Sequence, residues 1–183
     1  MNFCSNCGSD ALEFRIPDGD NLPRFCCEKC GTILYQNPRV VVGAIPVWDG
    51  KIMLARRGIS PRKGFWNLPC GFLELNETVE EGALREVLEE TGARVNLTGL
   101  HTIYNLPDAH QLYIIFTANM ASDYFTATSE STEIQLFKVE NIPWDEIAFS
   151  SNSFALKNYI NDLEQGFKHV HIGTFKKSKS DHY

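Results

Sequence analysis

Three glutamates near the middle of the chain have a spacing that can hold a metal ion. Glu86 and Glu90 are one helical turn apart, and Glu89 lies beside them. Carboxylates this close repel one another unless a cation neutralises them. Magnesium prefers oxygen ligands and is usually bound through a few carboxylates together with substrate phosphates. A solvated acidic helix face is the ordinary alternative for such a cluster, so the surrounding sequence has to decide between the two.

The residues around these glutamates predict the helix that would position them. Asn76 is a good N-cap, acidic side chains follow it in the first turn, and Gly92 suits the C-terminal end. We therefore expect a helix over residues 77–91. Its apolar positions should mostly lie on the other side and face a core; they are Val79, Ala83, Val87 and Leu88.

The segment from Gly71 to Ala93 also fits one long pattern, G-x5-E-x7-R-E-U-x-E-E-x-G-U, in which U is apolar. Every specified position is matched, which argues strongly against a chance match in a chain this short. The pattern is the Nudix box, and the chain resembles proteins of that family. The full pattern favours a metal-binding catalytic helix over a merely solvated one.

Four of the six cysteines form two pairs that are typical of a zinc site, Cys4-x2-Cys7 and Cys27-x2-Cys30. Four thiolates close a tetrahedral zinc site and leave no catalytic position. We predict that residues 1–34 form a zinc ribbon around a structural Zn²⁺. Disulfides are the alternative, and the intracellular character of the chain disfavours them.

The two remaining cysteines need separate interpretations. Cys26 adjoins Cys27 and could replace it as a ligand, but the spacing to Cys30 favours Cys27. Cys70 is expected to be a small packed residue, because free cysteine is among the more buried residue types. It is not interpreted as a nucleophile, since metal-assisted phosphoryl chemistry does not require one.

Composition narrows the class of protein. The 183 residues are 43% hydrophobic and 22% charged, which are globular values. The net charge of −6 argues against general binding to a phosphate backbone, so no nucleic-acid partner is expected. No apolar run is long enough to span a membrane, and the N-terminus lacks the features of a signal peptide. We therefore expect a cytoplasmic protein without a membrane partner.

Patterning outside the box predicts a strand-rich domain with a second helix. A strand is also expected within the ribbon, over residues 12–16, followed by a turn. The expected later strands cover residues 40–48, 51–56, 95–104, 111–119 and 133–139, and the second helix covers residues 153–165. From Gly166 onward we expect a partly mobile tail.

With box and ribbon both placed, the chain resembles Nudix hydrolases that carry an N-terminal zinc ribbon. Within that group it is similar to the FAD and ADP-ribose pyrophosphatases of plant plastids and bacteria. The likeness covers most of residues 3–175 and includes Tyr35-Gln36-Asn37-Pro38, Gly64-Phe65-Trp66-Asn67-Leu68-Pro69 and Ile147-Ala148-Phe149-Ser150-Ser151. It departs at Cys70, where many relatives have glycine or alanine, which affects fine substrate fit rather than metal binding.

The resemblance implies an α/β fold, the Nudix α/β/α sandwich around a mixed sheet. It divides the chain into a zinc ribbon (1–34), a Nudix domain (38–165) and a C-terminal tail (166–183). It also implies hydrolysis of a nucleoside diphosphate linked to another moiety, most simply FAD or ADP-ribose, giving AMP and a second monophosphate. One or more Mg²⁺ (or Mn²⁺) ions would be held by Glu86, Glu89, Glu90 and the Gly71 carbonyl.

The resemblance assigns further roles more loosely. Arg85 would orient Glu89, and the base would be Glu89, Glu130 or Glu133. Arg56 and Trp66 are expected to contact the substrate. Aromatic residues could stack a base or a flavin, although each is more often part of a core; they are Phe65, Trp66, Tyr104 and Tyr113.

Several alternatives stay open from the sequence. NADH pyrophosphatases also join a ribbon to the box, but their Ser-Gln-Pro-Trp-Pro-Phe-Pro-x-Ser signature does not follow Ala93. RNA cap hydrolysis is a further possibility within the same enzyme class. A non-catalytic nucleotide-binding module would be expected to have lost metal-site acids, and all of them are present. The expected partner is a small-molecule nucleotide, and a homodimer is possible.

Overall fold

The structure is a computed structural model that describes residues 1–176; the end of the predicted tail, residues 177–183, lies outside the described residues. The chain folds as two compact units, Met1–Asn37 and a second that begins at Pro38. Among the described residues, no helix is long and apolar enough to cross a membrane.

The first unit is a small antiparallel sheet of three strands in the order β1-β2-β3. The strands are β1 (Leu12–Arg15), β2 (Arg24–Cys27) and β3 (Ile33–Leu34). The expected strand over residues 12–16 is β1, and the expected turn leads into β2. Its small core contains Cys4, Cys27 and Leu34. So small a core cannot by itself supply much stability, which is the situation in which a structural metal helps.

The second unit is built around a mixed sheet in the order β10-β5-β4-β9-β8-β11, with β6 added to β5 and β7 added to β4. Its strands are β4 (Arg39–Trp48), β5 (Lys51–Arg57), β6 (Trp66–Asn67), β7 (Cys70–Phe72), β8 (Val95–Leu106), β9 (Gln111–Met120), β10 (Ser131–Phe137) and β11 (His171–Thr174). The pairs β4/β9 and β8/β11 are parallel, and the others are antiparallel. Short 3-10 turns are η1 (Pro107–Ala109), η2 (Val139–Asn141) and η3 (Trp144–Glu146).

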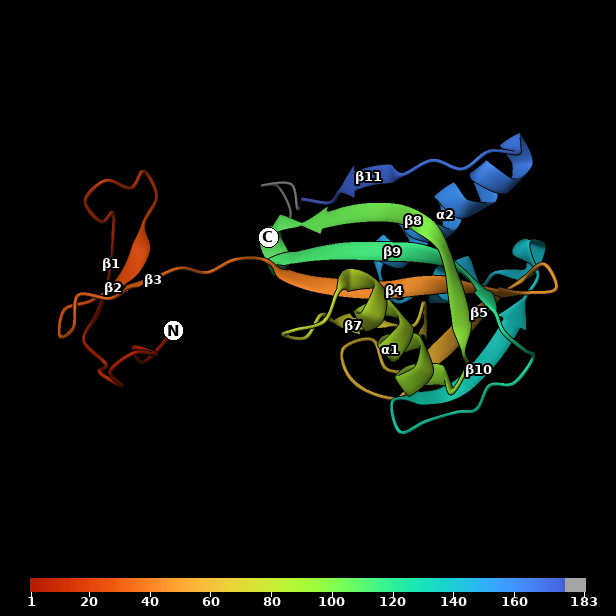
Figure 1. The fold of residues 1–183 in the computed structure, drawn as a ribbon, viewed down its shortest axis with the longest axis horizontal. Helices are drawn as coiled ribbons and strands as arrows, with labels where there is room; N and C mark the ends of the chain where they lie inside the picture. Colours follow the sequence, from red (N-terminus) through yellow and green to blue (C-terminus); the bar gives the residue numbers. More distant parts are fainter. Residues whose placement is uncertain (177–183) are drawn as a thin grey trace. The chain divides into compact units, whose positions relative to one another are not determined.

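Two helices cover opposite faces of this sheet, α1 (Val79–Thr91) and α2 (Ser150–Gln165) (Figure 1). Strand β4 shows why both faces are buried, because its side chains alternate between them. Val42 and Ala44 join the core under α1, whereas Val41 and Ile45 join the core under α2. The expected α/β/α sandwich with a mixed sheet and an N-terminal ribbon is therefore confirmed.

The helix that carries the carboxylates begins later than the sequence predicts. The N-cap is Thr78, whose hydroxyl accepts from the Glu81 N–H at 3.1 Å while the Glu81 carboxylate accepts from the Thr78 N–H at 2.8 Å. The prediction of Asn76 as the N-cap is wrong, because Asn76 adopts a left-handed turn with φ of 69°. A capping box satisfies two helix donors at once, which Asn76 could not do.

Two further expectations need correction. Leu88 was assigned to the apolar face of α1, but it is 41% exposed, while Ala83 and Val87 are fully buried. The expected tail contains β11, a strand that pairs in parallel with β8. Its pairing is with residues some seventy positions earlier, from His171 opposite Thr102 to Thr174 opposite Asn105, so no local pattern could show it.

Candidate active site

Glu86 and Gly71 are brought together by α1 and β7. Strand β7 pairs with β4, which holds Gly71 under the helix. A Cβ atom at Gly71 would overlap the Glu86 carboxylate. Only glycine therefore allows the carboxylate to lie against this strand, and the Gly71 backbone and the Glu86 side chain share one small space.

Arg85 ties the acidic side chains into a network. Its guanidinium donates to both oxygens of Glu77, at 2.7 and 3.1 Å. It also donates to Glu86 at 2.7 Å and to Glu89 at 3.0 Å. A further bond reaches the Phe72 carbonyl at 3.0 Å. The planar fork of arginine suits such multiple carboxylate contacts, so Arg85 orients more than the one glutamate that the sequence assigns to it.

Glu77 lies just before the helix and holds Arg85 in place. Its Oε1 accepts from the Glu74 N–H at 2.7 Å as well as from Arg85. The hydrogen bond from Arg85, followed by that from Glu74, lowers the pKa of Glu77. Glu77 is therefore a fixed anion that anchors the arginine, a role that the sequence analysis did not give it.

Glu86 and Glu90 form a pair of carboxyl groups that is mostly withdrawn from water. Each residue is 9% exposed. Burial raises the pKa of Glu90 to about 8, and the neighbouring Glu86 charge adds to the effect. Burial also raises the pKa of Glu86, partly offset by Arg85. Two adjacent buried carboxylates resist ionisation unless a positive charge joins them, and this donor set fits a hard divalent cation.

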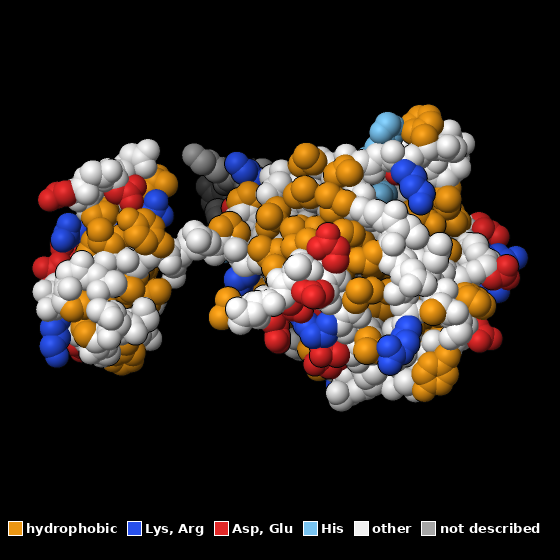
Figure 2. All heavy atoms as spheres, viewed as in Figure 1, with side chains coloured by type: hydrophobic (Ala, Val, Ile, Leu, Met, Phe, Trp, Pro, Cys, Tyr) orange, Lys and Arg blue, Asp and Glu red, His pale blue; other side chains and the backbone are white. Residues whose placement is uncertain are grey.

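Glu89 differs from this pair, because its side chain is 60% exposed and pairs with Arg85 at 3.0 Å. It lies at the open side of the network, where it remains available to a cation or to a water molecule. Acidic and basic side chains lie together over α1 and the segment that precedes it (Figure 2).

Two further charges act on the buried pair, Arg57 and Glu130. The Arg57 charge lowers and the Glu130 charge raises the pKa of Glu90, after the larger effects of burial and of Glu86. Glu130 also acts on Glu86. The backbone joins these residues, since the Gly58 N–H donates to the Glu130 carbonyl at 2.7 Å. Glu130 was one of the candidate bases, whereas Arg57 was missed.

The structure does not bring the expected residues Arg56, Trp66 and Glu133 to the carboxylates. Arg56 pairs with Glu133 at 3.3 Å and lies over the Trp66 ring, 4.8 Å from its centroid. Trp66 is 3% exposed and packs edge-on against Phe137 in the core under α2. All three lie on the face opposite α1, and Trp66 has no free face for stacking a base.

Strand alternation explains the difference between the two arginines. Leu54 of β5 belongs to the core under α2, whereas Met53 belongs to the core under α1. Side chains two residues apart share a face, so Arg56 follows Leu54 to the α2 face. Arg57 follows Met53 to the α1 face. The sequence contained this signal, because reading the predicted strand one residue further would have placed Arg57 beside the carboxylates.

Two other aromatic residues considered for stacking on the substrate are buried in the core. Tyr104 and Tyr113 are each 7% exposed and belong to the core under α2.

Cys70 is buried beside Asn67, whose amide donates to its sulfur at 3.7 Å. Burial raises the pKa of the Cys70 thiol well above its usual range, so the thiol stays protonated. These placements agree with the interpretation of Cys70 as a packed residue.

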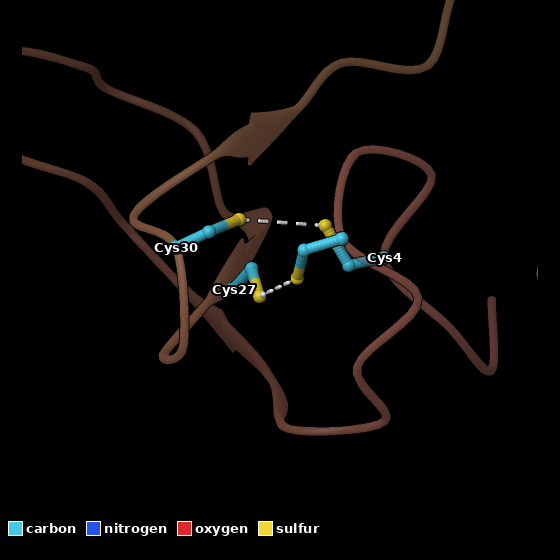
Figure 3. A group of neighbouring side chains, drawn as sticks. Cys4, Cys27 and Cys30 are labelled. Atoms are coloured by element: carbon cyan, nitrogen blue, oxygen red, sulfur yellow. Dashed lines mark hydrogen bonds between the residues drawn. The ribbon is translucent and has the colours of Figure 1, made fainter.

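The cysteine cluster of the first unit is separate from this site. The sulfur atoms of Cys4, Cys7, Cys27 and Cys30 all lie within 4.8 Å of one another. Figure 3 shows the side chains of Cys4, Cys27 and Cys30 turned toward one another. The separations Cys4–Cys30 and Cys7–Cys27 are 3.7 and 3.6 Å. A tetrahedral zinc with Zn–S bonds of ~2.3 Å requires sulfurs about 3.8 Å apart. The cluster thus fits a closed zinc site. Cys26 lies outside it, with its sulfur near the Arg24 carbonyl.

Comparison with known families agrees with the geometry. The NUDIX domain family matches residues 37–156, and the family described as Nudix N-terminal, a zinc ribbon, matches residues 2–36. The chain belongs to the Nudix family. The predicted resemblance, from the box on α1 and the paired cysteines, is confirmed.

Individual relatives show how much of this Nudix chain resembles known proteins. The crystal structure of a NUDIX hydrolase from Nitrosomonas europaea is 46% identical, with a TM-score of 0.93, and covers 97% of this chain and 100% of that one. An ADP-ribose pyrophosphatase of Methanocaldococcus jannaschii is 51% identical over 59 residues, 32% of this chain and 35% of the relative. A NAD-capped RNA hydrolase NudC of Pseudomonas aeruginosa is 36% identical over 97 residues, 51% of this chain and 31% of the relative. The chain thus matches about a third of the length of these curated relatives.

Proposed function

We propose that this Nudix protein hydrolyses the pyrophosphate bond of a nucleoside diphosphate linked to another moiety, in a reaction that depends on magnesium. The observation that carries the proposal is the buried pair Glu86 and Glu90, in which Glu86 lies against Gly71 and accepts a hydrogen bond from Arg85. All the acids of the box are present and converge, which disfavours a module that only binds nucleotides.

Glu86, Glu90 and Glu89, with the Gly71 carbonyl, would hold the cation. When bound, the cation neutralises charge that develops on the phosphate and activates a water molecule for attack. Arg85 keeps the carboxylates turned toward one space, because it contacts Glu86 and Glu89 at once. Glu77 fixes Arg85 in turn through its two oxygens.

Glu130 is the base that the structure supports best. Its charge reaches Glu86 and Glu90, and it follows Thr128 in a segment attached to α1. The Thr128 hydroxyl donates to the Glu90 carbonyl at 3.3 Å. Glu133, the earlier candidate, is engaged by Arg56 on the other face of the sheet. Glu89 remains the second candidate, since it is exposed beside the pair.

Arg57 is the cation that would meet the substrate phosphates. Arg57 ends β5, and its guanidinium stacks 5.0 Å from the centroid of the ring of Phe149, the residue before α2. Its charge reaches Glu90. Its Nε donates to the Pro61 carbonyl at 2.9 Å. These two contacts fix the group near Glu90, and bidentate arginine contacts suit phosphate oxygens. Arg57 takes the place that Arg56 was expected to fill.

ADP-ribose is the substrate that we favour, with FAD as the other member of the same class. Support comes from the name of the Methanocaldococcus jannaschii relative and from the resemblance to FAD and ADP-ribose pyrophosphatases. The name of the NudC relative adds NAD-capped RNA as another candidate substrate. The ribbon carries an excess of acids over bases (Asp10, Glu13, Asp18, Asp20 and Glu28 against Arg15, Arg24 and Lys29), which is unfavourable for an RNA backbone.

A substrate panel in heavy-oxygen water tests the proposal. ADP-ribose, FAD, NADH, NAD, a NAD-capped RNA and a diadenosine polyphosphate are incubated with magnesium and then with manganese. We expect AMP and a second monophosphate from ADP-ribose, with the heavy oxygen on a product phosphate. Glu86→Gln serves as the inactive control. Release of free adenine, label only on a sugar carbon, or no turnover of any dinucleotide would refute it.

A further inference from the structure

A cluster of three metal-ligand side chains lies on the α2 side of the sheet, away from the Nudix box. It comprises His101 on β8, Asp162 on α2 and His171 on β11. One ligand atom from each lies within 4.8 Å of the other two. The ribbon and the α1 carboxylates use none of these residues.

Close packing of β8, α2 and β11 brings the three residues of the cluster together. His171 and Gly173 are two residues apart on β11, so their side chains share the face that meets α2. A Cβ atom at Gly173 would come within 2.7 Å of the Phe154 ring on α2 and 2.8 Å of Tyr104 on β8. This close approach puts His171 beside Asp162. Figure 2 shows histidine side chains (pale blue) near the start of β11.

His101 is oriented as a ligand would be. Its Nε2 lies 3.0 Å from the Ala155 carbonyl oxygen. A carbonyl can only accept, so Nε2 carries the proton. Metal-binding histidines almost always donate their other ring N–H to a carbonyl or a carboxylate. The remaining nitrogen, Nδ1, faces Asp162 Oδ2 at 3.8 Å.

In this geometry two hydrogen-bond acceptors, His101 Nδ1 and Asp162 Oδ2, face each other between buried side chains. The side chains of His101 and Asp162 are 3% and 6% exposed. With the ring proton on Nε2, a neutral His101 has its lone pair on Nδ1. A lone pair and a carboxylate oxygen that face each other are unfavourable neighbours unless a cation or a proton lies between them.

His171 completes the set from the third side. Its Nε2 lies 3.0 Å from both oxygens of Asp162, and its side chain is 17% exposed. For zinc bonded to nitrogen and oxygen at ~2.0–2.2 Å, tetrahedral geometry places ligand atoms about 3.4 Å apart. The separations of 3.0 and 3.8 Å lie on either side of that value.

From these contacts we propose that His101 Nδ1, the Asp162 carboxylate and His171 Nε2 bind a divalent transition metal of the zinc class. Two imidazoles and one carboxylate suit zinc rather than magnesium. A cavity of about 480 Å³ lined by His101 and Asp162 adjoins the cluster, which leaves room for water as a further ligand. The ion fastens β11 to β8 and α2 and serves as a clip for the end of the sheet.

Zinc counting on the full-length protein is the first test. The protein is equilibrated with zinc in excess magnesium, which keeps the α1 carboxylates occupied, then desalted and analysed for metal. We expect about two zinc ions per chain, one in the ribbon and one in the clip. His171→Gln and Asp162→Asn should each lower the count to about one. His169→Gln is the matched control, because His169 contacts Asp162 through its backbone N–H and its ring meets the His171 ring only edge-on, 6.1 Å between centroids; it should keep both ions.

Hydrogen exchange supplies an independent readout that does not depend on activity. Zinc should slow exchange in β11 and in the facing part of β8 for the wild type and for His169→Gln. It should have no such effect in His171→Gln, a mild change at a partly exposed position. The proposal is overturned if the wild type holds only the ribbon zinc, or if zinc leaves β11 exchange unchanged. Either result would mean that His171 and Asp162 form an ion pair without metal.

Discussion

At the scale of single residues, the candidate site depends on carboxyl groups whose ionisation is opposed by burial. Glu86 and Glu90 are buried one helical turn apart, and burial raises both pKa values. The Glu86 charge adds to the effect on Glu90, whereas the Glu89 and Glu130 charges add to the effect on Glu86. Arg85 offsets part of this cost for Glu86, and Arg57 together with a hydrogen bond from the Cys70 backbone offsets part of it for Glu90. We therefore expect the metal-free protein to carry an electrostatic cost that a bound cation relieves.

Replacing either buried acid should separate catalysis from stability. Glu86→Gln and Glu90→Gln keep side-chain shape and remove charge, so turnover should fall by at least about a hundredfold, because the metal contributes several kcal/mol. The metal-free variants should unfold at the same temperature as the wild type or higher, since carboxylate repulsion is relieved. Steady-state kinetics and thermal melts in magnesium-free buffer measure both effects. Near-normal turnover in both variants would contradict this site.

The choice of base rests on Glu130 and Glu133, which lie three residues apart but act in different places. Glu130→Gln should lower kcat by about 10²- to 10⁴-fold, the usual contribution of a general base. Glu133→Gln breaks only an exposed pair with Arg56 and should change kcat by less than about fivefold. Equal effects of the two changes on kcat, with unchanged folding, would remove Glu130 from this role.

At the scale of elements, the start of α1 decides where the carboxylates point. Thr78 and Glu81 cap the helix reciprocally, which leaves Glu77 outside it and free to bind Arg85. A helix beginning at Glu77 with Asn76 as its cap would commit Glu77 to the first turn. The later start thus creates the Glu77–Arg85 anchor.

Removing the cap should weaken this element by a known amount. Thr78→Ala should cost about 1 kcal/mol of the free energy of unfolding and lower Tm by ~2–4 °C. Thr78→Ser keeps the hydroxyl and is the matched control, with little expected change. Chemical denaturation of the three proteins measures the difference. A Thr78→Ala variant as stable as Thr78→Ser would show that the capping box contributes nothing.

At the scale of the whole molecule, the chain combines a unit with a large core and a unit with a very small one. The second unit buries apolar residues on both faces of its sheet. The core of the ribbon contains three buried residues, and two of them, Cys4 and Cys27, belong to the cysteine cluster. We therefore expect its stability to depend on a metal bound by this cluster.

Loss of one thiolate should unfold the ribbon before it affects the chemistry. Cys30→Ser should release the ribbon zinc and remove the low-temperature part of the melting curve, while the unit that begins at Pro38 stays folded. Magnesium-dependent turnover should then persist in the cold. Metal analysis with calorimetry checks this expectation, and Cys26→Ser, outside the cluster, is the control. Unchanged zinc and an unchanged melt in Cys30→Ser would refute a structural metal.

The sequence by itself determined the family, the carboxylate helix and the cysteine pairs. Each depends on local spacing: Glu86 and Glu90 are one turn apart, and Cys4 and Cys7 lie within one knuckle. Strands such as β4 and β9 were equally visible, because β-branched runs are local signals. The α/β/α arrangement followed from the resemblance rather than from any local pattern.

Only the tertiary structure decided which distant residues share a face. Strand alternation, which the sequence could show, separates Arg56 from Arg57, but only the packing brings the charges of Arg57 and Glu130 within reach of Glu90. Trp66 is buried in the core under α2, and β11 pairs with β8, which is distant in sequence. The cluster of His101, Asp162 and His171 exists for the same reason. Three elements separated along the chain pack together, and no spacing rule connects them.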